Sequence, residues 1–165
     1  MSNRLNLREF QQNLIDRLQA SDSSDQRVST MGVQIAGRNW LVDMADIKEV
    51  LPLPKLTIVP LAKPWFRGMA NVRGSLYGVV DLAAYEQSGA ASGDSGNRVL
   101  LIADRYKFNV ALLVDRVLGL RDARSWRQSA GFDRQTEYHD EQGNPWRKLE
   151  ISGLLEQVEF LQISV

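Results

Sequence analysis

Apolar and polar positions alternate in short runs along most of this chain, and turn-forming residues separate the runs. After Arg27, a run with Val33 and Ile35 leads through a turn at Gly37 to the apolar run 40–42, which predicts a β-hairpin. The same pattern predicts further hairpins and strands at 57–59, 69–72 with 76–80, 99–103 with 108–114, 117–120 and 146–151. Roughly eight to ten short strands without βαβ alternation predict one or two small antiparallel barrels.

Helical periodicity is expected in only a few places. Leu7, Phe10, Leu14 and Leu18 form one apolar stripe, which predicts an amphipathic helix over residues 1–20. A polar linker follows at 21–27, and the main domain is expected at 28–165. Shorter helical turns are predicted at 44–50, after an Asp81 cap, and near the C-terminus. The apolar residues of that C-terminal helix are Leu154, Leu155, Val158 and Leu161. The segment 125–143 shows no clear pattern.

Composition narrows the possible classes of protein. The chain has 165 residues, which suits one domain or two small lobes that share a core. Lys+Arg and Asp+Glu each number 20, so no net charge draws the chain toward nucleic acid or anionic lipid. Cysteine is absent, which excludes disulfides and zinc-thiolate sites. Because charged residues interrupt the N-terminal segment, no signal peptide is predicted and we expect a cytoplasmic protein without membrane insertion.

Catalytic and nucleic-acid-binding chemistry find little support in the sequence. The single histidine, His139, lies beside Asp140 in a turn-rich segment, so a solvated turn is favoured over a metal ligand or a general base. No phosphate-binding loop or nucleophile motif occurs. The run from Arg121 to Arg127 is basic and contains Trp126, but Asp122 interrupts it and the net charge is zero. We therefore expect no enzyme activity, cofactor, metal or nucleic acid.

The most informative segment runs from Lys63 to Gly74 and continues into Val79-Val80-Asp81-Leu82. It predicts a loop, a strand, a tight turn at Arg73-Gly74 and a returning strand. Trp65 in this loop suits either a half-buried core position or an interface, and both interpretations stay open.

The Asn71-Val72-Arg73-Gly74 turn followed by 79–82 resembles the signature of CheW-like coupling proteins of bacterial chemosensory systems. The resemblance extends to 41–43, 47–50, 110–117 and 153–155, in family order and spacing. Within the family, the chain is most similar to the PilI group of type IV pilus twitching-motility systems, because of Lys63-Pro64-Trp65 and the preceding amphipathic helix.

The resemblance implies a mainly β fold of two packed, five-stranded SH3-like β-barrels, with an N-terminal helix and a short C-terminal helix. It also implies a non-catalytic adaptor that couples the tip of a methyl-accepting chemoreceptor to the regulatory domain of a CheA-type histidine kinase. Such a protein is cytoplasmic and is recruited to membrane receptor arrays.

Residues that match the receptor-facing region of the family are Ile47, Glu49, Val50, Val72 and Arg73. The resemblance assigns apolar contacts to Ile47, Val50 and Val72, and polar contacts or groove organisation to Glu49 and Arg73. Asn71, Gly74 and Asp81 belong to the motif itself.

Two alternatives remain open. Within the same family, the alternative is that the chain is a kinase regulatory domain or a coupler fused to a receiver. In a different class, it is a small-barrel binding module for another protein or for nucleic acid, which a steep salt dependence of binding would reveal.

Overall fold

The computed structural model describes residues 11–12, 30–86, 95–131, 135–157, 160 and 162. Gln11 and Gln12 are helical. The rest of the expected helix 1–20, the linker 21–27 and residues 87–94 lie outside the described residues, as do Val158 and Leu161 of the predicted C-terminal helix.

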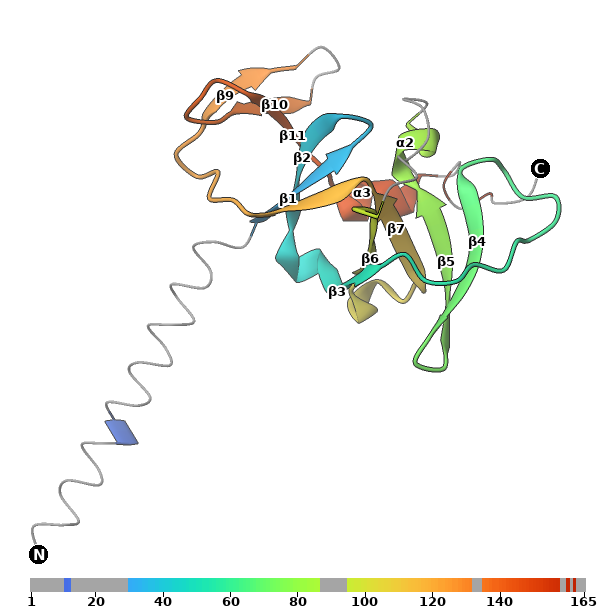
Figure 1. The fold of residues 1–165 in the computed structure, drawn as a ribbon. Helices are drawn as coiled ribbons and strands as arrows, with labels where there is room; N and C mark the ends of the chain where they lie inside the picture. The colour runs from blue at the N-terminus through green and yellow to red at the C-terminus, as the bar shows by residue number, and fades with distance from the viewer. Residues whose placement is uncertain are drawn as a thin grey trace, which may run out of the picture.

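Two β-sheets form the body of the protein (Figure 1). The six-stranded lobe has the strand order β8-β1-β2-β11-β10-β9. Its strands are β1 (Thr30–Ile35), β2 (Arg38–Asp43), β8 (Arg116–Leu120), β9 (Arg127–Ala130), β10 (Thr136–His139) and β11 (Pro145–Lys148). All but one of its strand pairs are antiparallel, and the exception is the parallel pair of β11 with β2.

The five-stranded lobe has the order β3-β6-β7-β5-β4. Its strands are β3 (Ile47–Pro52), β4 (Phe66–Val72), β5 (Ser75–Asp81), β6 (Arg98–Ile102) and β7 (Val110–Val114). Short helical elements connect the strands or follow them: η1 (Met44–Asp46), α2 (Leu82–Tyr85), η2 (Asp104–Tyr106) and α3 (Ile151–Glu156). The apolar pair Leu154 and Leu155 lies in α3, which packs at the junction of the two lobes (Figure 1).

The expected pair of closed five-stranded barrels needs correction, because both sheets are open in their strand order. One sheet has six strands, and each sheet contains a parallel pair, β2 with β11 and β5 with β7. In the five-stranded lobe, the chain after β3 turns back and meets β4 through an isolated bridge between Thr57 and Met69. The predicted strand 57–59 is reduced to this bridge.

Both faces of the five-stranded sheet are buried, which explains the near-continuous apolar runs of β6 and β7. Leu100 and Leu112 contribute to a large core that also contains α3 and residues of the six-stranded lobe. Their neighbours Val99 and Leu113 belong to a second, smaller core on the other face. Because side chains alternate between the faces of a strand, one sheet separates the two cores.

Two segments differ from the sequence expectation. The predicted helical turn at 44–50 is only η1, and the residues after it form β3 because they pair with β6. The patternless segment 125–143 contains β9 and β10, which pair with each other. The last predicted strand ends at Lys148, and Ile151 begins α3.

Candidate functional site

The motif turn at Arg73-Gly74 is a two-residue β-hairpin between β4 and β5. Val72 pairs with Ser75, and both turn residues have positive φ, 51° for Arg73 and 87° for Gly74. These angles suit a type I′ turn, in which Gly is favoured and an Arg is uncommon. The side chain of Asn71 fixes the turn, because its Oδ1 accepts a hydrogen bond of 2.9 Å from the backbone N–H of Gly74.

Arg73 forms a bidentate ion pair with Glu49 of β3. Its Nη1 and Nη2 each donate to one carboxylate oxygen at 2.5 Å. The hydrogen bond from Arg73 lowers the pKa of Glu49 and in return raises the pKa of Arg73, so both are charged at neutral pH. Since β3 is one edge of the five-stranded sheet and β4 the other, this pair joins the two edges of a curled sheet. Arg73 remains 70% exposed and is accessible to a partner.

The apolar residues predicted for the same region are divided between the two cores. Ile47 and Val50 lie on β3 beside Glu49, and both pack partly buried against the larger core. Val72 precedes Arg73 in the hairpin and packs against the smaller core. The structure therefore brings Glu49 and Arg73 into contact. In the pairing with β6, Glu49 lies on the face of the smaller core, which Val72 also faces. Ile47 and Val50 lie on the other face of β3, toward the larger core.

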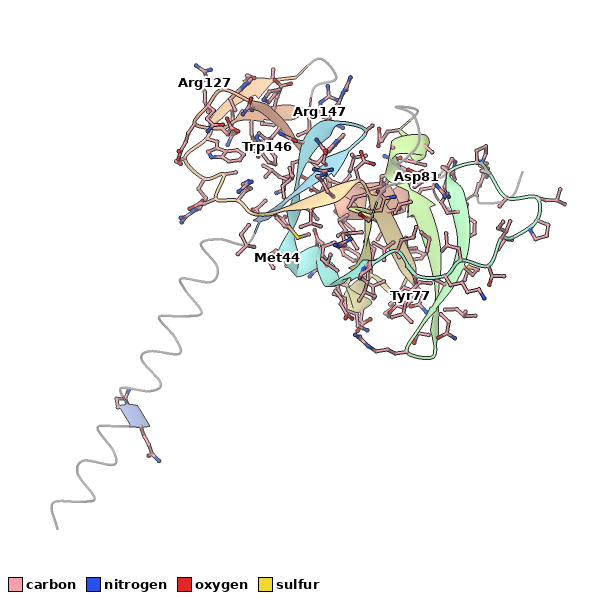
Figure 2. The ribbon with its side chains drawn as sticks, viewed as in Figure 1. Met44, Tyr77, Asp81, Arg127, Trp146 and Arg147 are labelled. Atoms are coloured by element: carbon pink, nitrogen blue, oxygen red, sulfur yellow. The ribbon has the colours of Figure 1, made fainter. Side chains whose placement is uncertain are left out.

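Asp81, the third motif residue, is a buried cap at the junction of β5 and α2 (Figure 2). Its Oδ1 accepts a hydrogen bond of 3.3 Å from the backbone N–H of Ala84, as the predicted helix cap requires. Its Oδ2 lies 3.4 Å from Nη1 of Arg67 on β4. Asp81 thus connects α2 to the β4–β5 hairpin.

A polar brace near the start of β3 was not visible in the sequence. The Tyr106 hydroxyl donates to Asp46 Oδ1 at 2.6 Å, and Arg105 forms an ion pair with the same carboxylate. The hydrogen bond to Asp46 is the main reason why the pKa of Tyr106 is raised. These partners lie about 60 residues apart in the chain, so no local pattern could reveal them. The brace fixes η1 against η2 and thereby positions β3.

The segment between β3 and β4 exposes two large aliphatic side chains. Ile58 and Leu61 are each 82% exposed, and Leu61 has a positive φ of 58°. Lys55 and Lys63 flank them, and neither lysine forms an ion pair with another described residue. The one sequence signal for this surface is the spacing of Pro52, Pro54, Pro60 and Pro64, which restricts the backbone.

Trp65, for which core and interface were both open, packs against two other aromatic side chains at the edge of the larger core. Its ring stacks on Phe160 with centroids 6.0 Å apart and meets Tyr85 edge to face at 5.2 Å. The indole is half-buried in this aromatic cluster. The cluster connects Phe160, near the C-terminal end of the described chain, to the loop that leads into β4.

The surroundings of His139 do not form a catalytic relay. Ser129 Oγ lies 2.9 Å from His139 Nε2, and Glu137 Oε1 lies 3.3 Å from the same nitrogen. A Ser-His-acid triad needs the acid on the other ring nitrogen, where it can orient the imidazole. Within the described residues, no group of three potential ligands could hold a metal ion. In the same part of the chain, no helix is long and apolar enough to cross a bilayer.

Comparison with known proteins identifies the family to which the chain belongs. Residues 29–157 match the CheW-like domain, which covers most of the chain. This protein belongs to the CheW-like family. The family prediction made from the 71–74 turn is thereby confirmed.

One relative and one solved structure extend this result. Over 104 residues, the chain is 33% identical to protein PilI of Pseudomonas aeruginosa, and the match covers 63% of this chain and 58% of PilI. The crystal structure of the scaffolding protein TtCheW from Thermoanaerobacter tengcongensis matches with a TM-score of 0.65 at 17% identity. That match covers 80% of this chain and 94% of TtCheW. At this identity the structural match supports the fold of the CheW-like domain.

Proposed function

We propose that this protein is a non-catalytic adaptor that couples chemoreceptors to a CheA-type histidine kinase. Membership in the CheW-like family supports an adaptor, and the similarity to PilI supports a pathway that controls type IV pilus twitching motility. The protein would act in the cytoplasm at receptor arrays. The observation that carries the proposal is the exposed Arg73–Glu49 ion pair at the tip of the motif hairpin.

The receptor tip binds at this hairpin. A chemoreceptor tip is a helical hairpin, and such an element presents both apolar and charged side chains to its partner. Val72 offers an apolar contact on the same face as the ion pair, and the partly buried Ile47 and Val50 offer further ones from the other face of β3. Glu49 and Arg73 set the register of the complex. Because the turn is held by Asn71 and the ion pair, the surface is ordered before it binds and loses little entropy on association.

The kinase regulatory domain binds at a different surface, as a bridging adaptor requires. Ile58 and Leu61 provide two exposed aliphatic anchors on a segment stiffened by prolines. Lys55 and Lys63 favour a partner with acidic residues around an apolar groove. This segment precedes β4 and lies against its middle through the Thr57–Met69 bridge, whereas the Arg73 turn follows β4, so the two partners contact different parts of the β4–β5 hairpin.

The test measures both affinities by calorimetry, with the purified chain titrated by the kinase regulatory domain and by receptor tip fragments from the same genome. Arg73→Glu should weaken receptor binding by about tenfold or more, because it places like charges together in the interface. Ile58→Ser with Leu61→Ser should weaken kinase binding and leave receptor binding unchanged. Arg38→Glu, an exposed charge reversal in the six-stranded lobe, is the matched control.

The double variant Glu49→Arg with Arg73→Glu separates folding from recognition. It restores an ion pair between the same two positions with reversed charges, so the hairpin should stay ordered while receptor binding remains weak. Receptor affinity equal to that of the unmodified protein in folded Arg73→Glu would refute the receptor surface. Absence of binding to both partners would refute the coupling function.

A further inference from the structure

A cavity of about 610 Å³ opens at the edge of the six-stranded lobe, away from the hairpin tip. It lies between the end of β8, the loop that follows it and the turn between β10 and β11. Because β8 and β9 are the two edges of this sheet and do not pair, the sheet leaves an opening here. Six of its lining residues carry the argument: Arg121, Asp122, Trp126, Asp140, Glu141 and Trp146.

Two tryptophans form the aromatic wall of this cavity. Their ring centroids lie 5.3 Å apart with an interplanar angle of 50°. Trp146 (Figure 2) is only 4% exposed, and its Nε1 donates a hydrogen bond of 3.0 Å to Asp140 Oδ2. Its indole also packs tightly on β1, since a Cβ at Gly32 would come within 2.9 Å of Trp146 Cζ3. The Trp146 side of the wall is therefore fixed before any ligand arrives.

The charges around the cavity are mainly negative. Asp140 accepts hydrogen bonds of 2.9 Å from the backbone N–H groups of Gln142 and Asn144, and the hydrogen bond from Trp146 is the main cause of its lowered pKa. Asp122 is held by Arg124 at 2.7 Å. Glu141 is exposed, and its carboxylate forms no hydrogen bond or ion pair with another described residue. It is the carboxylate most available to a cation.

The guanidinium group of Arg121 already contacts the aromatic wall. The guanidinium carbon of Arg121 lies over the Trp146 ring, 5.8 Å from its centroid. Indole rings attract guanidinium and ammonium groups through their negative faces, and the attraction increases when the cation is desolvated. Arg121 therefore stands in for an external ligand and at the same time competes with it.

We propose that this cavity binds the cationic side chain of an arginine or lysine from a protein partner. The tryptophan faces receive the apolar stem and the positive group, and Glu141 pairs with the charge. A free amino acid would bring a carboxylate toward Asp122, Asp140 and Glu141, so a side chain within a polypeptide suits the cavity better. The cavity volume falls within the usual range for a specific ligand site, about 300–1,000 Å³.

Nuclear magnetic resonance on the full chain tests this site directly. The chain has four tryptophans, and each indole N–H gives its own signal. Titration with N-acetyl-arginine amide or N-acetyl-lysine amide should move the Trp126 and Trp146 signals to saturation and leave those of Trp40 and Trp65 in place. N-acetyl-citrulline amide has nearly the shape of the arginine compound without its charge and should have no effect.

Variants then assign the interaction to particular groups. Trp126→Leu and Glu141→Gln should each weaken binding of the arginine compound by about two- to fivefold, and Arg121→Gln should strengthen it by a similar factor. Glu156→Gln on α3 removes an equivalent exposed charge elsewhere and should change nothing. Equal responses to the citrulline and arginine compounds, or unchanged affinity in Glu141→Gln, would overturn the proposal. Tighter binding of free arginine than of the blocked compound would overturn its assignment to a polypeptide.

Discussion

Substitution of Gly68 by Ala tests how the chain between β3 and β4 is held in place. Gly68 lies in β4 at a register shift and has a φ of +135°, a region that is essentially restricted to glycine. A Cβ at this position would lie 2.4 Å from the carbonyl oxygen of Thr57. That oxygen accepts a hydrogen bond of 2.8 Å from Met69, whose own carbonyl accepts one of 2.8 Å from Thr57. The new methyl group cannot be accommodated unless these two hydrogen bonds break.

The cost follows from these contacts. Backbone strain at such a φ is about 1–3 kcal/mol, and each lost hydrogen bond contributes about 0.5–1.5 kcal/mol. We therefore expect Gly68→Ala to lower the free energy of unfolding by about 2–6 kcal/mol. Urea denaturation followed by tryptophan fluorescence measures it, and faster hydrogen exchange at the Thr57 and Met69 amides should accompany the loss.

Alanine substitutions at two other glycines distinguish the cost of backbone strain from the cost of a steric clash with neighbouring atoms. Gly74 has a φ of +87° and open space around its Cβ position, so Gly74→Ala should cost only about 1–2 kcal/mol. Gly153 lies in α3, where the nearest atom would be 3.7 Å away, and Gly153→Ala should stabilise the protein by about 0.5–1 kcal/mol. If Gly68→Ala costs no more than Gly74→Ala, the Thr57–Met69 contact does not hold this segment.

Two further predictions concern side chains of the motif hairpin and of the cavity rim. Asp81→Ala should lower the free energy of unfolding by about 0.5–2 kcal/mol, because it removes the cap of α2. Asp81→Asn keeps a side-chain oxygen for the cap and should retain more stability. Urea denaturation measures both. A cost for Asp81→Asn as large as for Asp81→Ala would contradict the capping role. The Arg124 guanidinium lowers the pKa of Asp122 to about 2, so its carboxyl signal should titrate there by magnetic resonance and return toward 3.8 in Arg124→Gln. Since the pKa of Asp122 is lower in the folded state, its pairing with Arg124 stabilises the protein above the unfolded pKa, and this stabilisation disappears as the pH falls toward 2. An unchanged titration midpoint of Asp122 in Arg124→Gln would contradict the pairing.

The elements foreseen from the sequence are those whose signal is local. The β1–β2, β4–β5 and β6–β7 hairpins and the Asp81 cap follow from turn residues and apolar runs that stand next to each other in the chain. The residues 127–130 are exposed along their whole length, so β9 carries no apolar alternation. It is a strand because β10 pairs with it and β11 pairs with β10. Such tertiary pairing leaves no trace in local propensity.

In the candidate site, too, local features were predictable from the sequence and contacts between distant segments were not. Arg73 and Gly74 were singled out by their turn, and the 24-residue separation of Arg73 from Glu49 was spanned only through the family resemblance. The brace of Asp46 with Arg105 and Tyr106, and the pairing of Trp126 with Trp146, depend on how distant strands meet. A helical interpretation of 44–50 was also consistent with the spacing of Met44, Ile47 and Leu51. Residues 47–52 form a strand rather than a helix because β3 pairs with β6.

The order of the strands has a consequence for how the chain is made. The whole five-stranded lobe lies between β2 and β8, so it is an insertion within the six-stranded lobe. During synthesis β1 and β2 leave the ribosome first, but their neighbours β8 and β11 follow only after residues 44–114 have emerged. The inserted lobe can therefore fold while the first hairpin still has two unpaired edges, which are open to contacts with other chains. Translation to Lys148, the end of β11, sets the earliest moment at which β2 acquires its second neighbour.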